Sequence, residues 1–403
     1  MEQAGGDDYQ GPERSTSRVT YPSPMPEENG LLREAAAHRE QEARAEPDTE
    51  LPIGELLRIV IARGASDLHL TMGAPPVIRL HGHLVRLVEY PVLEARMLRR
   101  GLYGILTQRN RDRFEENWEL DFSHTMPGEG RFRVNLYLQR DAVGAAFRLI
   151  PGEIPKIRDL GLPEQIGSFA KLNRGLVLVT GPTGSGKSTT LAALVDVINR
   201  SRDVHVMTVE DPIEFVHEHN HSVINQREVG TDTKSFASAL RHVLRQDPDV
   251  ILVGEMRDLE TIATALTAAE TGHLVFATLH TQDASQTVDR VIDVFPPHQQ
   301  QQIRIQLAAS LQGIVVQQLM PVRQGGGRVV ATEVLMATPA IRNLIREAKT
   351  HQIYSAIQAG GQFGMQTMDA SLARLVKMDR VDYNVASERA QNLDDFKELV
   401  RRA

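Results

Sequence analysis

A short apolar run that leads straight into closely spaced glycines constrains the fold of this chain more than any other feature. Residues 176–190 read LVLVTGPTGSGKSTT, and the first four are types that favour strands. After Lys187, apolar residues recur at intervals of three and four, at Leu191, Leu194, Val195 and Ile198, which is helical spacing. The glycines are therefore expected at a turn that leads from a strand into a helix.

This turn has the spacing of a phosphate-binding loop (P-loop). In the pattern Gly181-x4-Gly186-Lys187-Ser188, the glycines let successive N–H groups face one anion, and the positive end of the next helix adds to the attraction. Lys187 is expected to reach the β- and γ-phosphates, and the Ser188 hydroxyl to complete the shell of a Mg²⁺ ion. The sequence thus predicts that a nucleoside triphosphate is held by Gly181, Pro182, Thr183, Gly184, Ser185, Gly186, Lys187, Ser188 and Thr189.

Composition excludes several classes of protein. The 403 residues include no cysteine, so a disulfide framework, a thiolate zinc site and a cysteine nucleophile are all excluded. No apolar run approaches the roughly 18 residues of a membrane span, and residues 1–21 lack a signal-peptide core. We therefore expect no direct membrane span, and a reducing cytoplasm fits the absence of cysteine.

The net charge of −7 is concentrated at one end of the chain. Residues 1–50 contain 12 acidic residues and 5 arginines, whereas the remaining residues carry 40 acidic residues and 40 lysines or arginines. A neutral folded part lacks the basic excess that general nucleic-acid binding requires. No nucleic-acid partner is therefore expected.

Five segments are expected along the chain. They are a disordered acidic tail (1–50), an α+β domain (51–150), a proline-marked linker region (151–175), an ATPase core (176–338) and a helical C-terminal region (339–403). The α+β domain is predicted to contain helices at 53–62 and 93–114, the latter broken near Thr107, strands at 66–71 and 77–87, and a hairpin at 131–139 and 142–150 into which Asp121 and Phe122 lead.

The core is expected to form a largely parallel sheet covered by helices, because strand and helix patterns alternate. Strands are predicted at 204–209, 250–253 and 274–278, with a possible antiparallel hairpin at 317–322 and 329–336. Helices are predicted after it at 340–349, 353–358, 368–378 and 387–400.

Two acidic segments are expected at the carboxyl edge of this sheet. Residues 249–255, DVILVGE, form an apolar strand that ends in a carboxylate, and residues 210–214, EDPIE, follow another strand. Ligands of such sheets lie at this edge, so Glu255 is expected to hold Mg²⁺ through water or to accept a proton from the attacking water. Glu214 is the second candidate for activating water, although Asp-Pro also favours a plain turn.

Histidine and arginine supply the other candidates. His280 follows the strand 274–278 beside Thr278, where it could sense the γ-phosphate, whereas His273 before the strand reads as a structural residue. Phosphoryl transfer often uses an arginine to neutralise developing charge. The hairpin is rich in this residue, at Arg131, Arg133, Arg140 and Arg148, and a solvated arginine face is an equal alternative from the residues alone.

Seven blocks together resemble the ATPase family of type IV pili and type II secretion, and in particular its twitching-motility retraction ATPases. They are ASDLHL (65–70), GPTGSGKST (181–189), EDPIEF (210–215), NQREVGTDTKSF (225–236), DPDVILVGEMRD (247–258), TGHLVFATLHT (271–281) and AIRNLIRE (340–347). The P-loop alone is generic, but the set in this order is specific. The resemblance covers residues 51–403.

The resemblance implies an α/β fold in which a smaller, PAS-like α+β domain precedes a RecA-like P-loop ATPase domain with a helical C-terminal region. It implies a homohexamer that binds ATP and Mg²⁺ between subunits. By this resemblance Glu255 is the Walker-B glutamate, Glu214 the acid of the Asp box and His280 the histidine that faces the nucleotide. Arg133 and Arg148 match arginines that reach from the N-terminal domain into the nucleotide site.

Two features point to pilus retraction within the family. Assembly and secretion ATPases usually carry a CxxC…CxxC zinc element, and this chain has no cysteine. AIRNLIRE resembles a retraction signature, and its periodicity predicts that Ile341, Leu344 and Ile345 are buried while Arg342, Asn343, Arg346 and Glu347 face outward.

The predicted function is therefore a retraction motor that works on an inner-membrane pilus platform protein, at the cytoplasmic face of that membrane. The alternatives are an accessory retraction ATPase, a zinc-free assembly or secretion ATPase and, more distantly, a RecA-like nucleic-acid motor. The acidic tail is longer than is usual in the family.

Overall fold

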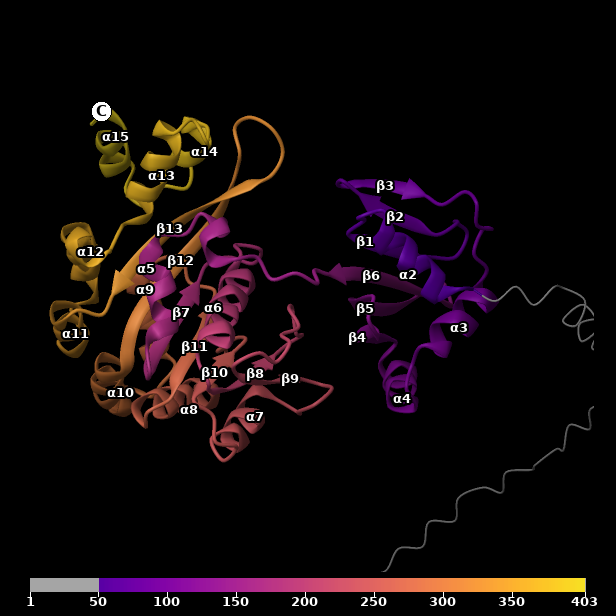
Figure 1. Cartoon of the computed structure of the whole chain (residues 1–403), viewed down its shortest axis with the longest axis horizontal. Helices are drawn as coiled ribbons and strands as arrows, with labels where there is room; N and C mark the ends of the chain where they lie inside the picture. The colour runs from indigo at the N-terminus through magenta and orange to yellow at the C-terminus, as the bar shows by residue number, and fades with distance from the viewer. Residues whose placement is uncertain (1–50, 403) are drawn as a thin grey trace, which may run out of the picture. The chain divides into compact units, whose positions relative to one another are not determined.

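The computed structural model describes residues 51–402, and the tail predicted for residues 1–50 lies outside them. Two sheets organise the described residues (Figure 1). None of the helices between residues 51 and 402 is both long and apolar enough to cross a membrane.

The first sheet is antiparallel and has the strand order β3-β2-β1-β6-β5-β4. Its strands are β1 (Asp67–Leu70), β2 (Val77–Leu80), β3 (His83–Arg86), β4 (Glu119–Met126), β5 (Gly130–Gln139) and β6 (Ala142–Ile150). Three helices accompany it, α2 (Ile53–Ala62), α3 (Ala95–Gly104) and α4 (Gln108–Asn117). The break predicted near Thr107 is confirmed, because the Thr107 side chain caps α4 by accepting from the Asn110 N–H group.

Strand β4 is longer than the sequence predicted. Only Asp121 and Phe122 were expected to lead into the hairpin, yet eight residues pair with β5, from Glu119 opposite Tyr137 to Met126 opposite Gly130. The polar run Ser123, His124 and Thr125 interrupts the apolar alternation that marks a half-buried strand. Pairing with β5 overrides this weak local pattern.

The second sheet has the order β13-β12-β7-β11-β10-β8-β9. Its strands are β7 (Gly175–Thr180), β8 (His205–Glu210), β9 (Val223–Glu228), β10 (Val250–Val253), β11 (Leu274–Leu279), β12 (Leu311–Pro321) and β13 (Arg328–Met336). Neighbouring strands run parallel except for β13, which pairs antiparallel with β12 in the predicted hairpin. Strand β9 was not predicted, because VINQRE contains only two apolar residues and lies at the sheet edge.

This sheet separates two hydrophobic cores, because successive side chains of a strand face opposite sides. Leu176 and Leu178 of β7 pack with α7 (Phe236–Val243), α8 (Leu259–Glu270), α9 (Ala284–Asp293) and α10 (Pro297–Ser310). Val177 and Val179 pack on the other side with α5 (Glu164–Ser168) and α6 (Lys187–Ser201). Ile166 and Phe169, from the predicted linker region, belong to this second core. The domain boundaries remain predictions.

The C-terminal region is helical, as predicted, but its last segment is divided. Its helices are α11 (Pro339–Arg346), α12 (Ile353–Ala359), α13 (Met368–Lys377), α14 (Tyr383–Ser387) and α15 (Leu393–Arg401). The segment predicted around 387–400 is confirmed for α15, but its start is wrong, because the chain is not helical between the end of α14 and Leu393. The buried Asp369 carboxylate accepts hydrogen bonds from the backbone N–H groups of Gln391 and Asn392, and Asn392 caps α15. These contacts come from α13 and were not visible in the local pattern.

Arg342 is not directed outward as predicted. Its Nε atom donates to the Ala337 carbonyl at 2.9 Å, and its Nη1 atom donates to the carbonyls of Ala308 and Ala309, the latter at 2.8 Å. Both alanines lie in the last turn of α10, where carbonyls lack helical partners and a cation is favourable. Leu344 is also only half-buried, whereas Ile341 and Ile345 are fully buried.

Arg342→Ala is therefore expected to lower the free energy of unfolding by about 1–3 kcal/mol, because three charge-assisted hydrogen bonds to carbonyls disappear. Thermal unfolding of the purified protein measures the effect. Arg346→Ala is the matched control, since this exposed arginine donates to a neighbouring side chain, Asn343, of its own helix, and its loss should cost less than about 0.5 kcal/mol. Equal melting temperatures for the two variants would show that Arg342 does not hold α10.

A buried carboxyl group on β13 is expected to make the stability of the protein depend on pH. Glu333 is 1% exposed. Burial raises its pKa to about 7, and the charges of Asp283 and Asp369 act in the same direction, against the N–H groups of Ala284 and Met368. In the unfolded chain the group ionises near its ordinary pKa of 4.5, so folding binds a proton between these values. Stability is therefore lost as pH rises from about 4.5 to 7.

Glu333→Gln should remove this loss, because the amide is never ionised and its oxygen can still accept from the Ala284 N–H group. We expect the variant to exceed the parent in unfolding free energy by a few kcal/mol at pH 8, and by much less at pH 5. Urea unfolding at both pH values measures this difference. A constant difference across pH would contradict a raised pKa at this position.

Candidate active site

The glycine-rich loop connects β7 to α6, as the sequence predicted. β7 is buried at every residue, and α6 begins at Lys187. Gly181, Gly184 and Gly186 have positive φ angles of 134°, 78° and 90°, which strain other residue types. At Gly181 a Cβ atom would lie 2.2 Å from the Gln317 carbonyl oxygen. The loop is therefore packed tightly against β12, and only glycine fits there.

Lys187 is held inside this loop. It is 9% exposed, and its Nζ atom donates to the carbonyl oxygens of Gly181 at 2.9 Å and Pro182 at 3.1 Å. Burial lowers the pKa of Lys187, and the negative charge of Glu255 opposes that shift. An ammonium group that lies in a buried loop and donates to two neutral carbonyls is suited to an anionic ligand.

The carboxyl ends of β10 and β11 bring Glu255 and His280 together, as predicted. The Glu255 Oε1 atom lies 3.0 Å from His280 Nε2 and 2.6 Å from Arg257 Nε. His280 Nδ1 in turn lies 3.5 Å from Lys187 Nζ. Since a carboxylate only accepts hydrogen bonds, His280 Nε2 carries a proton in this arrangement. Lys187, His280, Glu255 and Arg257 form one connected chain.

Glu255 is a charged group in this setting. Burial acts to raise its pKa, but hydrogen bonds from Arg257 and His280, together with their charges, outweigh it and lower the pKa below the usual value. The carboxylate therefore stays ionised at neutral pH and can accept a hydrogen bond from water. A lowered pKa makes it a weak proton acceptor, so positioning of water is favoured over outright proton removal.

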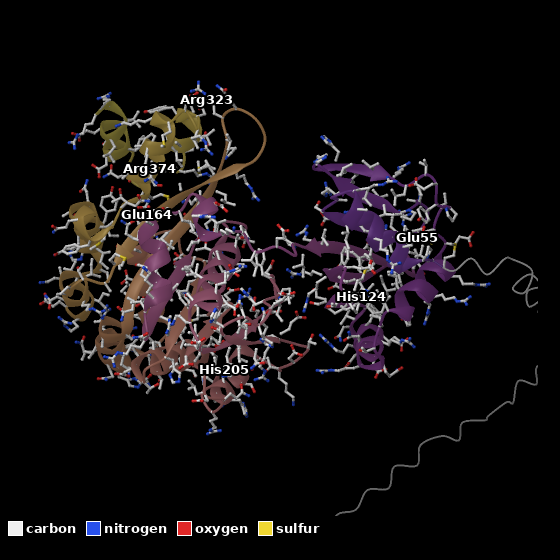
Figure 2. The ribbon with its side chains drawn as sticks, in the orientation of Figure 1. Glu55, His124, Glu164, His205, Arg323 and Arg374 are labelled. Atoms are coloured by element: carbon white, nitrogen blue, oxygen red, sulfur yellow. The ribbon has the colours of Figure 1, made fainter. Side chains whose placement is uncertain are left out.

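Glu210 and Glu214 have different environments, although Glu210 ends β8 and Glu214 follows it by four residues. This strand starts at His205, labelled in Figure 2, and ends at Glu210. Burial raises the pKa of Glu210, against hydrogen bonds from Thr208 and Gln226, which donate at 2.6 Å and 3.1 Å. Glu210 is thus engaged with the neighbouring strand. Glu214 is exposed, and the described residues offer its side chain no hydrogen bond, so it is available to a ligand.

The loop residues fit a bound phosphate. Ser185 Oγ and Thr180 Oγ1 are buried, and neither has a hydrogen-bonding partner among the described residues. Unpartnered buried hydroxyls at a positive helix end indicate a missing polar ligand. Ser188, the second residue of α6, is exposed. Its hydroxyl and the Glu255 carboxylate are oxygen ligands of the kind that Mg²⁺ prefers.

Arg133 and Arg148 are direct register partners on β5 and β6. Arg148 Nε donates to the buried Asp67 carboxylate at 2.8 Å. No side-chain hydrogen bond or ion pair within residues 51–402 uses the terminal nitrogens of Arg148 or the guanidinium group of Arg133. No hydrogen bond or ion pair within residues 51–402 joins either arginine to residues 181–189.

Arg131 has a different role from its neighbours on β5. Its Nη2 atom lies 2.6 Å from Oε2 of Glu228, a residue that is 3% exposed. The same carboxylate accepts from the Ser123 hydroxyl and from the Ile213 N–H group. Glu228 thus ties the first sheet to the segment that carries Glu214, and Arg131 is excluded as a free catalytic arginine.

Sequence reasoning missed two of these residues, Arg257 and Glu228. Arg257 follows Glu255 by two positions within the block DPDVILVGEMRD, so its closeness to the strand end was a usable signal. Glu228 lies on the unpredicted strand β9. His273 was predicted as structural, and its Nδ1 atom lies 3.0 Å from the Ala268 carbonyl in α8.

Comparison with known proteins gives the family. Residues 157–381 match the profile of the type II/IV secretion system protein family. The chain is 52% identical over 346 residues to the type IV pilus retractation ATPase PilT of Pseudomonas aeruginosa, which covers 86% of this chain and 100% of that protein. It is 49% identical over 321 residues to a twitching motility protein of Neisseria gonorrhoeae, covering 80% of this chain and 86% of that protein.

A solved structure agrees with these sequence matches. The crystal structure of the pilus retraction motor PilT with bound ADP has a TM-score of 0.82 and 49% identity, covering 87% of this chain and 100% of that one. Both comparisons support an α/β fold with an antiparallel-sheet domain, a mixed-sheet ATPase domain and C-terminal helices. The chain therefore belongs to the type II/IV secretion system protein family, in which it is similar along most of its length to the pilus retraction ATPases.

Proposed function

We propose that this chain is a Mg²⁺-dependent ATPase motor that powers type IV pilus retraction as a hexameric ring, with ATP bound between subunits. The observation that carries the proposal is the connected chain Lys187, His280, Glu255 and Arg257 at the end of a glycine-rich loop. The similarity of the chain, over 86% of its length, to a pilus retractation ATPase supports pilus retraction as the movement that ATP hydrolysis powers.

The loop residues hold the nucleotide in this proposal. Backbone N–H groups between Gly181 and Gly186 and the buried Ser185 hydroxyl bind phosphate oxygens. Lys187 exchanges its carbonyl partners for the β- and γ-phosphates, and Thr189 supports the loop at the start of α6. Bound Mg-ATP supplies the anhydride bond that is broken and the divalent charge that neutralises its oxygens.

The acidic residues act on water and on the metal shell. Ser188 and Glu255 would hold Mg²⁺ by their oxygen atoms, and Glu255 would also orient the attacking water. Glu214, which is exposed, is the second candidate for activating the attacking water. His280 links Glu255 to Lys187 and so senses whether the γ-phosphate is present.

The proposed partners are other copies of the chain and an inner-membrane platform protein of the pilus. Ring formation would bring Arg133 and Arg148 of one subunit to the nucleotide of the next. There, the guanidinium nitrogens that make no hydrogen bond within a single chain would bind phosphate oxygens. Asn343 and Arg346 on α11 and the following Glu347 are exposed and are proposed to contact a partner. Attachment to the cytoplasmic face of the membrane would follow from the platform protein.

Deletion of the gene, with pilus imaging and a twitching assay, tests the function. Hyperpiliated, non-motile cells that are restored by the parent allele support retraction. Bald cells would indicate an assembly motor, and piliated cells that still twitch would indicate an accessory role. DNA-stimulated hydrolysis by the purified protein would instead favour the nucleic-acid motor.

A further inference from the structure

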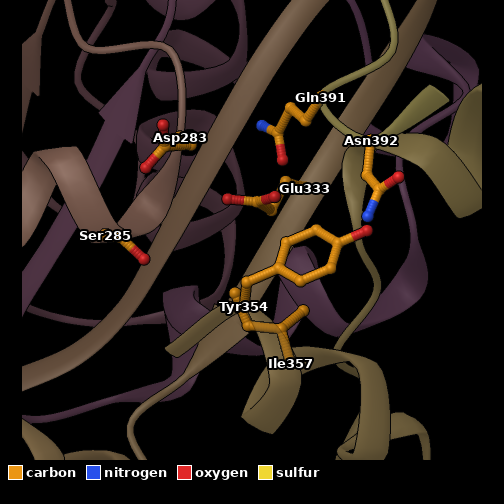
Figure 3. A pocket seen from close by; sticks show the side chains of 7 residues that line it. All are labelled: Asp283, Ser285, Glu333, Tyr354, Ile357, Gln391 and Asn392. Carbon is orange, nitrogen blue, oxygen red and sulfur yellow. The ribbon is translucent and has the colours of Figure 1, made fainter. Parts of the chain in front are cut away.

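An acidic cavity lies apart from the nucleotide loop, between β13, the start of α9 and the C-terminal helices (Figure 3). Its volume is about 330 Å³, within the range of small-molecule sites. The lining residues are Asp283, Ser285, Glu333, Tyr354, Ile357, Gln391 and Asn392. Gln391 and Asn392 are exposed, so the cavity opens to solvent beside the break between α14 and α15.

Glu333 is the buried group that is directed into this cavity. One carboxyl oxygen, Oε1, accepts from the Ala284 N–H group at 2.7 Å. The other, Oε2, is buried and makes no hydrogen bond of good geometry within residues 51–402, although the Met368 N–H group lies close enough to the carboxyl group to lower its pKa. Figure 3 shows the carboxyl group among the other lining side chains, between Asp283 and the Tyr354 ring. A buried oxygen without a partner is costly unless a ligand satisfies it.

The surroundings of Glu333 contain further acids and no basic side chain. Asp283 lines the cavity, while Asp369 and Asp395 both accept from the Tyr354 hydroxyl at 3.0 Å. The residues that line the cavity include no lysine, arginine or histidine. Carboxylates that share a site without a cation repel one another, so the cavity attracts positive charge.

We propose that this cavity binds a small organic cation, a guanidinium or primary ammonium group on a short aliphatic stem. Glu333 Oε2 and Asp283 would accept from the cationic head, with Gln391 and Asn392 as further polar partners. The Tyr354 ring and Ile357 form an apolar wall for the stem. A metal ion fits less well, because residues 51–402 contain no group of three metal-ligating side chains that could hold one.

The position of the cavity connects it to the nucleotide site through a short segment. Asp283 caps α9 by accepting from the Gln286 N–H group and follows His280 by three residues. The Gln391 side chain donates to the Gln282 carbonyl. An occupant would therefore contact the segment that runs from His280 into α9.

Binding of a cation should strengthen with pH. Glu333 is largely protonated below its pKa of about 7, and Asp283 on α9, Asp369 on α13 and Tyr354 on α12 are the titratable groups that face it. Only the ionised carboxylate attracts the ligand, so one linked proton makes the affinity about tenfold higher at pH 8 than at pH 6.

Isothermal titration calorimetry of the full chain with n-butylguanidine tests the proposal, and n-butylurea is the neutral probe of the same shape. We expect butylguanidine to bind and butylurea to bind at least about tenfold more weakly. Glu333→Gln should weaken butylguanidine binding by about tenfold or more. Glu388→Gln removes an equal charge from a nearby exposed residue that does not line the cavity, and it should leave binding unchanged.

Ser285→Leu provides a second variant, which keeps every acid and fills part of the cavity. It should also weaken binding by about tenfold or more, and so it tests the cavity independently of the charge of Glu333. The proposal is overturned if butylguanidine does not bind at about 10 mM, where even a millimolar site would be filled. Equal binding of butylurea, or binding that survives both cavity substitutions, overturns it as well.

Discussion

Glu255→Gln is expected to lower ATP turnover by about 100-fold to 1,000-fold while leaving nucleotide affinity within a few-fold of the parent. The amide has the shape of the carboxylate and can still accept from Arg257, so the loop and its lysine stay in place. It lacks the negative charge that orients water and completes the metal shell. The contacts that residues 181–189 make with the nucleotide do not depend on the charge of Glu255.

Hydrolysis rates and the affinity for a fluorescent nucleotide, measured on the same preparation, separate these two effects. Glu260→Gln is the matched control, because Glu260 is an exposed acid on α8 that pairs with Arg241 at 2.9 Å. The pKa of Glu255 lies below its usual value of 4.5, so its ionisation should not limit the parent enzyme above about pH 5. Hydrolysis by Glu255→Gln at the parental rate would remove this residue from the mechanism.

The local parts of the site could be predicted from the sequence because each depends on neighbouring residues. The loop follows from glycine spacing between a strand and a helix, and the placement of Glu255 and His280 follows from the rule that parallel strands present their carboxyl ends at one edge. The helix α2 was predicted with its observed bounds, since Ile53, Leu56, Leu57 and Val60 repeat at helical spacing.

Contacts between distant segments could not be predicted. Arg342 looked like an outward residue because helical periodicity says nothing about the carbonyls of another helix, here α10. Strand β9 pairs with β8 through its backbone, so its polar sequence gave no signal. The unpartnered oxygen of Glu333 and the role of Glu228 depend on residues that lie far away in the chain.

Arg133→Ala and Arg148→Ala are each expected to lower turnover by orders of magnitude if the arginine neutralises charge at a neighbouring nucleotide, since an arginine of this kind contributes about 10³-fold or more. The two side chains are register partners on one face of the first sheet. Asp67 holds Arg148 through Nε alone, which leaves the terminal nitrogens of its guanidinium group for a phosphate. Arg86→Ala, an exposed arginine of β3 in the same sheet, should retain the parental rate.

Mixed rings distinguish an arginine that acts across subunits from one that acts within its own chain. Arg148→Ala chains keep Lys187, and Lys187→Ala chains keep Arg148, so each preparation alone should be inactive. In an equal mixture about one quarter of the interfaces would pair an intact loop with an intact arginine, if assembly is random, and activity should recover to about that fraction. An arginine that served its own nucleotide would give no recovery, because every chain in the mixture carries one defect. Subunit exchange, confirmed by mass measurement of differently tagged chains, makes an absence of recovery decisive against action across subunits.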